Sequence, residues 1–141
     1  MKFKLLIAVL CLLISTILSG CLNQKETMVL LDEKIQGIEV SKSMGVGNVN
    51  EDIHVSFNHK NSIKVFEKAI KSAIKDKVEL KAEPDYDIVV SYGDEFPKHA
   101  VHLWLGKENE ESILTYMVGE GETYRTSAKI TNQLRELILT K

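Results

Sequence analysis

The sequence has few cysteines, few prolines and almost no net charge. Only Cys11 and Cys21 occur among 141 residues, and Cys11 lies in an apolar N-terminal run, so no pair of thiols is expected to form a disulfide or a zinc site. Two prolines and eight glycines exclude a low-complexity or collagen-like chain. A formal net charge of −2 lacks the basic excess with which proteins hold nucleic acid. The length also excludes a complete α/β barrel.

The first 20 residues have the pattern of a secretory signal peptide. Lys2 and Lys4 give it a positive start, and residues 5–18 form an almost unbroken apolar run. This run of 14 residues is shorter than the roughly 20 that a membrane-spanning helix needs. We therefore expect residues 1–20 to be cleaved from the mature protein.

The peptide ends in Leu18-Ser19-Gly20-Cys21, which resembles the lipobox of bacterial lipoproteins. The resemblance implies cleavage between Gly20 and Cys21 and attachment of diacylglycerol to the Cys21 thiol. Two acyl chains hold a protein stably at a bilayer, whereas one holds it marginally. The alternatives are an uncleaved anchor or a signal peptide that happens to end beside a cysteine. The expected location is the extracytoplasmic side of the cell membrane, with the bilayer as partner through diacylglyceryl-Cys21.

The mature chain divides into a short N-terminal segment and one domain. Residues 21–34 begin polar and become apolar, which we interpret as a lipidated tether. Residues 35–141 contain no linker and no internal repeat, so they are predicted to form a single domain.

Within this domain, period-2 alternation predicts strands and 3.6-residue spacing predicts helices. Strands are predicted over residues 35–41, 53–57, 86–92, 100–105 and 112–118, with a further short edge strand at 124–125. Helices are predicted over residues 62–75 and from Ser127, a good capping residue, to the C-terminal end. The order β-β-α-β-β-β-α predicts an α+β fold, in which two helices pack on one face of an antiparallel sheet of about five strands.

Four lysines of the first predicted helix are spaced four, three and four residues apart, namely Lys64, Lys68, Lys71 and Lys75. This spacing places their ammonium groups on one stripe. Such a stripe is usually a solvated helix face. The alternative is a basic stripe that is attracted to anionic lipid or to teichoic-type polymers, at about 1 kcal/mol per basic residue.

No linear motif of a known catalytic or metal site occurs. The four histidines, at positions 54, 59, 99 and 102, lack zinc-ligand spacing, and no serine lies in a Gly-x-Ser-x-Gly elbow. Acidic residues cluster in predicted turns, as in Glu83-Asp85-Asp87, where solvated charge is the favoured interpretation. We therefore expect no metal, no cofactor and no enzymatic activity.

The segment His102-Leu103-Trp104-Leu105-Gly106 combines aromatic and apolar side chains on both faces of a predicted strand. If helices cover one face, the other presents His102, Trp104 and Tyr116 as a binding patch, because exposed apolar patches mark interaction surfaces. The alternative is that the tether or the N-terminal hairpin packs over these rings.

Four segments together resemble the small YhfM-like lipoproteins of Bacillus-type bacteria. They are Val55-Ser56-Phe57, the helical segment 66–71, Ala82-Glu83-Pro84-Asp85-Tyr86-Asp87 and the segment 102–106. The resemblance covers roughly residues 35–140 and the signal peptide. It implies a membrane-anchored extracytoplasmic domain, and it supplies no catalytic residues.

The function predicted from these observations is that of a non-enzymatic envelope lipoprotein that binds a protein or a cell-wall polymer through the aromatic patch. One alternative is a small-ligand carrier or sensor with a pocket between sheet and helices. Another is a small hydrolase built on carboxylates or histidines.

Overall fold

The computed structural model describes residues 25–140, so the expected signal peptide and the expected cleavage and lipidation site at Gly20 and Cys21 lie outside the described residues. The described chain forms seven strands and two helices, with these bounds: β1 (Gly37–Lys42), β2 (Ile53–Phe57), α2 (Lys60–Lys71), β3 (Ile74–Lys75), β4 (Tyr86–Ser91), β5 (His99–Trp104), β6 (Ser112–Tyr116), β7 (Thr123–Thr126) and α3 (Ala128–Leu139). Neither helix is long and apolar enough to cross a bilayer.

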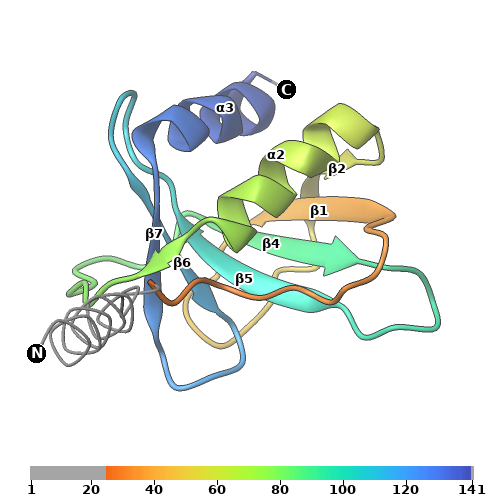
Figure 1. Ribbon diagram of the computed structural model, residues 1–141, viewed down its shortest axis with the longest axis horizontal. Helices are drawn as coiled ribbons and strands as arrows, with labels where there is room; N and C mark the ends of the chain where they lie inside the picture. The colour runs from red at the N-terminus through yellow and green to blue at the C-terminus, as the bar shows by residue number, and fades with distance from the viewer. Residues whose placement is uncertain (1–24, 141) are drawn as a thin grey trace, which may run out of the picture.

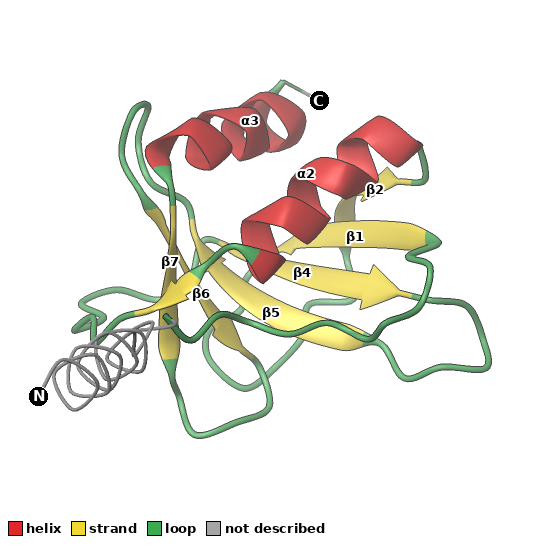
Figure 2. Ribbon diagram, viewed as in Figure 1, coloured by secondary structure: helices red, strands yellow, loops and turns green. Residues whose placement is uncertain are grey.

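All strands belong to one antiparallel sheet in the order β2-β1-β4-β5-β6-β7-β3. Helices α2 and α3 lie side by side on one face of it (Figure 1), and long loops join the strands (Figure 2). The predicted α+β class is therefore confirmed. The predicted number of about five strands is wrong, because the described residues form seven. Strand β3 has only two residues, which is too short to show a period of two.

Helix α2 buries one side and ends earlier than its sequence pattern predicts. Ile63, Phe66, Ala69 and Ile70 face the sheet, and the Phe66 ring packs on Phe57 of β2 with centroids 5.1 Å apart. The helix ends at Lys71. The chain then turns into β3, which pairs with β7, so β7 is an inner strand rather than the predicted edge.

Helix α3 closes the same layer. The Ser127 side chain caps it by accepting a hydrogen bond from the backbone N–H of Ile130 at 3.4 Å. Between the helices and the sheet lies the hydrophobic core. Its fully buried members on the strands are Val40, Ile88, Val90, Val101, Leu103 and Leu114.

The segment before β1 is part of the folded unit rather than a free tether. Met28 and Leu30 are 2% and 7% exposed, and Ile35 is buried with them in the core. Thr27 forms an isolated antiparallel bridge with Ile74 of β3. In Figure 1 this segment, in orange, crosses below α2 before it enters β1. The expected tether, residues 21–34, therefore belongs to the fold from about residue 26 onward.

Candidate functional site

A row of polar side chains crosses the sheet on the face opposite the helices. The pairing register joins five residues from neighbouring strands β1, β4, β5, β6 and β7 in one line, namely Ser41, Asp87, His102, Thr115 and Thr123. Alternation along each strand turns them away from the apolar core. All five are nevertheless buried, because the loops that follow β1 and β3 cover them.

Asp87 and His102 form a hydrogen-bonded pair in the middle of this row. The His102 Nδ1 atom lies 2.8 Å from the Asp87 Oδ1 atom, and both side chains are completely buried. On the other side of the ring, the backbone N–H of Gly47 donates to His102 Nε2 at 3.3 Å. A backbone N–H can only donate, so Nε2 carries a lone pair and the ring proton is on Nδ1, pointing at Asp87. The pair thus holds a neutral histidine in a fixed tautomer.

The loop between β1 and β2 covers the pair through backbone groups. The N–H of Asn50 donates to Asp87 Oδ2 at 3.2 Å, and the N–H of Val46 donates to Glu83 Oε2 at 3.3 Å. Gly45 and Gly47 have φ values of +99° and +97°, in the left-handed region that favours glycine. Glycine is therefore what allows this loop to turn a backbone N–H toward the histidine ring.

A groove of about 380 Å³ lies beside the pair on the same face. Val89 and Ala100, the next outward residues along β4 and β5 from Asp87 and His102, form part of it. It is also lined by Ser41, Val49, Asn50, Ile53 and the charged Glu39, Glu51 and Lys98. Asn50 lines the groove, and its backbone N–H bonds Asp87, so this residue connects the groove to the pair.

The neighbouring hydroxyl groups are not directed at His102. The Thr115 Oγ1 atom donates to the backbone oxygen of Glu122 at 2.6 Å. Ser41 lies on β1, which is two strand spacings, about 9.6 Å, from β5. Neither hydroxyl can therefore pass its proton directly to the histidine in this arrangement.

The three residues of the predicted aromatic patch do not share one exposed surface. His102 is fully buried, and the half-buried Trp104 donates from Nε1 to the backbone oxygen of Ala82 at 2.8 Å. Tyr116 pairs with Val101 and so faces the helix side, where its hydroxyl donates to the backbone oxygen of Val29 at 2.8 Å. The strand register thus separates Tyr116 from the other two rings, and the N-terminal segment and the loops cover them.

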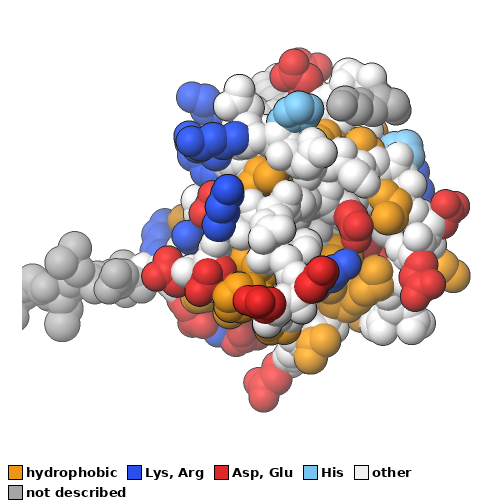
Figure 3. All heavy atoms as spheres, turned by 90° about the vertical axis from the view of Figure 1, so that its right-hand side faces the viewer, with side chains coloured by type: hydrophobic (Ala, Val, Ile, Leu, Met, Phe, Trp, Pro, Cys, Tyr) orange, Lys and Arg blue, Asp and Glu red, His pale blue; other side chains and the backbone are white. Residues whose placement is uncertain are grey.

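The predicted basic stripe is shorter than expected. Lys64, Lys68 and Lys71 are exposed on α2, where Lys71 pairs with Glu67 at 3.4 Å. Lys75 lies on β3 instead. On the face seen in Figure 3, basic side chains gather at one side, while acidic and hydrophobic ones are interspersed over the rest. Among residues 25–140, no three metal-ligating side chains are grouped to hold an ion.

The sequence gives a weak signal for the Asp87–His102 pair. Asp87 interrupts the apolar residues of β4, and His102 interrupts those of β5, 15 positions later. A polar residue inside a strand that is otherwise apolar needs a buried partner. Nothing in the sequence identifies that partner, because the strand register alone brings the two together.

The fold of this chain is similar to that of a protein whose crystal structure is known. That protein is described as a thioesterase-like protein from Clostridium sporogenes, and the match has a TM-score of 0.60 and 17% sequence identity, over 76% of this chain and 96% of that one. The chain belongs to the YhfM protein family, whose model matches residues 24–141. No curated protein matches it in sequence.

The structural match contradicts the predicted function of a non-enzymatic domain that binds an envelope partner or carries a small ligand. That prediction rested on the absence of linear catalytic motifs. The fold recurs in a protein described as thioesterase-like, and the Asp87–His102 pair is assembled from two strands without any such motif. At 17% identity the likeness establishes the fold alone.

Proposed function

We propose that this protein is a hydrolase of carboxylic thioesters or esters, with His102 as the general base. The observation that carries the proposal is the buried Asp87–His102 pair, in which Nε2 is an acceptor and Nδ1–H is held by a carboxylate at 2.8 Å. This arrangement orients a neutral imidazole for proton abstraction. The likeness to a thioesterase-like protein supports the choice of reaction class.

The groove is the place for the acyl part of the substrate. Its volume of about 380 Å³ is within the usual range for small-molecule sites, and Val89, Ala100 and Ile53 give it apolar lining. Substrate entry requires the Gly47 N–H to leave Nε2, which the loop can do by turning at its glycines. The freed N–H is then a donor for the oxygen that becomes negative in the transition state.

Water is the nucleophile in this scheme, since the hydroxyls of Ser41 and Thr115 are not positioned to attack. His102 Nε2 takes a proton from water as the water oxygen bonds to the carbonyl carbon. The tetrahedral intermediate then breaks its C–S or C–O bond, and His102 returns the proton to the leaving thiolate or alkoxide. The products are a carboxylic acid and a thiol or alcohol. Asp87 acts as a positioning residue, because it holds the ring without touching the substrate.

The test is hydrolysis of short and medium acyl-coenzyme A thioesters and p-nitrophenyl esters by the purified chain, residues 21–141. His102→Asn keeps a donor toward Asp87 but removes the base, so turnover should fall by about 10²-fold or more with an unchanged circular dichroism spectrum. The matched control is His99→Asn, because His99 bonds the Tyr92 hydroxyl away from the pair. Undiminished turnover in His102→Asn, or no turnover of any substrate by the unaltered chain, would refute the proposal.

We also propose that the mature protein is a lipoprotein of a Bacillus-type, Gram-positive cell, anchored in the cell membrane through diacylglyceryl-Cys21. The lipobox resemblance of Leu18-Ser19-Gly20-Cys21 supports it, together with the charged start and the apolar run before it. The exposed lysines of α2, namely Lys64, Lys68 and Lys71, would add attraction to anionic lipids or wall polymers. With Cys21→Ser, the protein should either remain unprocessed or appear in the medium instead of the membrane fraction. Unchanged membrane binding and processing would exclude the lipid anchor.

A further inference from the structure

The N-terminal segment is fastened to β3 and to the end of α2 by backbone hydrogen bonds. The N–H of Lys75 donates to the Glu26 carbonyl oxygen at 2.8 Å, and the N–H of Met28 donates to the Ala73 carbonyl oxygen at 3.3 Å. Between them, Thr27 bridges to Ile74. We call residues 26–31 the strap, because this short segment is paired with the domain as an additional strand would be.

Two tyrosines, the partly buried Tyr116 and the buried Tyr92, hold the other half of the strap. The Tyr116 hydroxyl donates to the Val29 carbonyl oxygen at 2.8 Å and accepts from the Val29 N–H. The Tyr92 hydroxyl accepts from the Leu31 N–H at 3.3 Å. The side chain of Met28 lies in the core beside these contacts. The strap is therefore fixed along its length rather than at one point.

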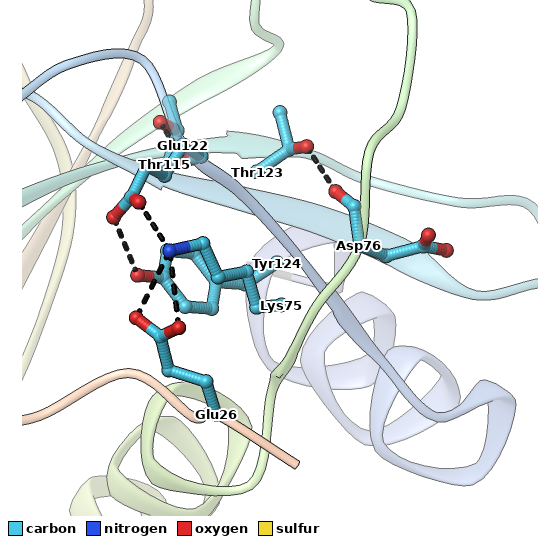
Figure 4. A network of polar contacts seen from close by, with 7 residues as sticks. All are labelled: Glu26, Lys75, Asp76, Thr115, Glu122, Thr123 and Tyr124. Atoms are coloured by element: carbon cyan, nitrogen blue, oxygen red, sulfur yellow. Dashed lines mark hydrogen bonds and ion pairs between the residues drawn. The ribbon is translucent and has the colours of Figure 1, made fainter.

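A cluster of charges fixes the beginning of the strap. Figure 4 shows the Lys75 ammonium between the carboxylates of Glu26, from the strap, and Glu122, at the start of β7. Lys75 lies 3.0 Å from Glu26 Oε1, and the Tyr124 hydroxyl donates to Glu122 Oε2 at 3.1 Å. Hydrogen bonds from Lys75 and Tyr124 lower the pKa of Glu122, and those to Glu122 and Glu26 raise the pKa of Lys75. Both groups therefore stay charged at neutral pH.

The fastening sets how far the domain can stand from a lipid on Cys21. Glu26 is the fifth residue after Cys21, and this stretch reaches at most about 17 Å. A domain of this size is about 35 Å across, so its opposite end cannot touch the bilayer while the strap holds. If the strap were free, the 14 residues that follow Cys21, through Ile35, would reach about 48 Å, which allows any orientation.

We infer that the strap is a rigid mount that keeps one end of the domain against the lipid surface, namely the end formed by β3 and the loops 76–83 and 117–122. The inference rests on the proposed lipid anchor and is independent of the proposed hydrolysis. The loops belong to this end because the Val78 N–H donates to the Thr123 hydroxyl at 3.1 Å, next to Glu122. The loop between β4 and β5 lies at the far end of the long axis in Figure 1. The lipid surface is thus the partner of the β3 end.

Orientation can be measured because Cys21 is the sole cysteine of the mature chain. Residues 21–141 are coupled through it to maleimide lipids in phosphatidylcholine–phosphatidylglycerol vesicles that carry dansyl headgroups. Trp104→Phe removes the one tryptophan of the chain. Val118→Trp then places a fluorescence donor at the β3 end, and Phe96→Trp places one at the opposite end. Val118 and Phe96 are both exposed, in the loops 117–122 and 92–98. Energy transfer to dansyl should be several-fold greater for Val118→Trp.

A variant with a loosened strap is the matched control. The double variant Lys75→Met with Tyr116→Phe lacks the ion cluster and the tyrosine hydroxyl. In it, the difference in energy transfer between the donors at positions 118 and 96 should become smaller, while the circular dichroism spectrum stays unchanged. If the double variant unfolds, Tyr116→Phe alone takes its place. The inference of a rigid mount would be overturned by equal energy transfer from both donor positions in the protein with an intact strap. It would also be overturned if the variant with a loosened strap showed the same difference between the two positions. Since the coupling is chemical, this result does not depend on lipidation in the cell, which Cys21→Ser tests separately.

Discussion

Gly106 occupies a point at the end of β5 where the backbone leaves no space for a side chain. A Cβ atom there would lie 2.3 Å from the Glu111 carbonyl oxygen and 2.9 Å from its carbon. Both atoms are backbone, so they cannot rotate away. The Gly106 carbonyl also accepts a hydrogen bond from Arg135 of α3 at 3.0 Å, and the N–H donates to the Ser112 hydroxyl at 3.0 Å. The loop between β5 and β6 is thus closed around this glycine.

We therefore expect Gly106→Ala to lower the free energy of unfolding by about 3 kcal/mol, as overpacked substitutions do. Gly119→Ala is the matched control, because its Cβ would meet only the Tyr116 Cβ atom at 3.8 Å, an ordinary contact. That variant should stay within about 0.5 kcal/mol of the unaltered protein. Urea unfolding of the three proteins measures the difference, and equal stabilities would show that the loop relaxes freely.

At the scale of single residues, the sequence supports the candidate site only in part. The sequence predicts His102 as a site residue because it lies in a strand with aromatic side chains. The expectation that it is exposed is wrong, because the side chain is fully buried. Asp87 is interpreted as a solvated turn charge, although it is buried in β4. The pairing of β4 with β5 places these residues opposite each other, and the loop with Gly47 seals them. Register and loop closure depend on the whole sheet, which no local pattern encodes.

Between elements, the Lys75–Glu122 contact joins β3 to the start of β7, and its strength should depend on pH. Because the pKa of Glu122 is lowered in the folded state, its stabilising effect is complete above the ordinary value of 4.5 and is lost as the pH falls through the lower folded value. The stability difference between the unaltered protein and Glu122→Gln should be constant near neutral pH and shrink toward pH 3. Urea titrations at several pH values measure it. A difference that does not change with pH would show that Glu122 makes no charge-dependent contribution.

Among the elements, those with long repeating patterns are predictable from the sequence and the short ones are not. The helix that contains Phe66 and Ile70 has an apolar stripe that only a helix can bury, and Ser127 marks the start of α3. Strand β3 consists of Ile74 and Lys75, and its spacing fits the preceding helix equally well. Only pairing with β7 and with Thr27 ends the helix before them. Tertiary pairing thus overrides the local period at this point.

For the molecule as a whole, the boundary of the domain follows from burial rather than from polarity. Residues 21–34 contain enough polar side chains to suggest a tether, but Met28 and Leu30 fill the core beneath α2. Each contributes roughly 1.5–3 kcal/mol through burial. The strap therefore serves two purposes, because the residues that complete the core also shorten the link to Cys21.

A chain that begins at residue 35 should therefore be less stable than one that begins at residue 25, by about 4 kcal/mol from the loss of Met28 and Leu30 alone. That is a large part of the 5–15 kcal/mol that typically stabilises a domain. Urea unfolding of the two chains measures the difference. If the shorter chain does not fold, Met28→Ala in residues 21–141 gives the same information, with Val29→Ala as control because Val29 is 69% exposed. Equal stability in either comparison would mean that the strap is not part of the core, and the rigid mount would lose its physical basis.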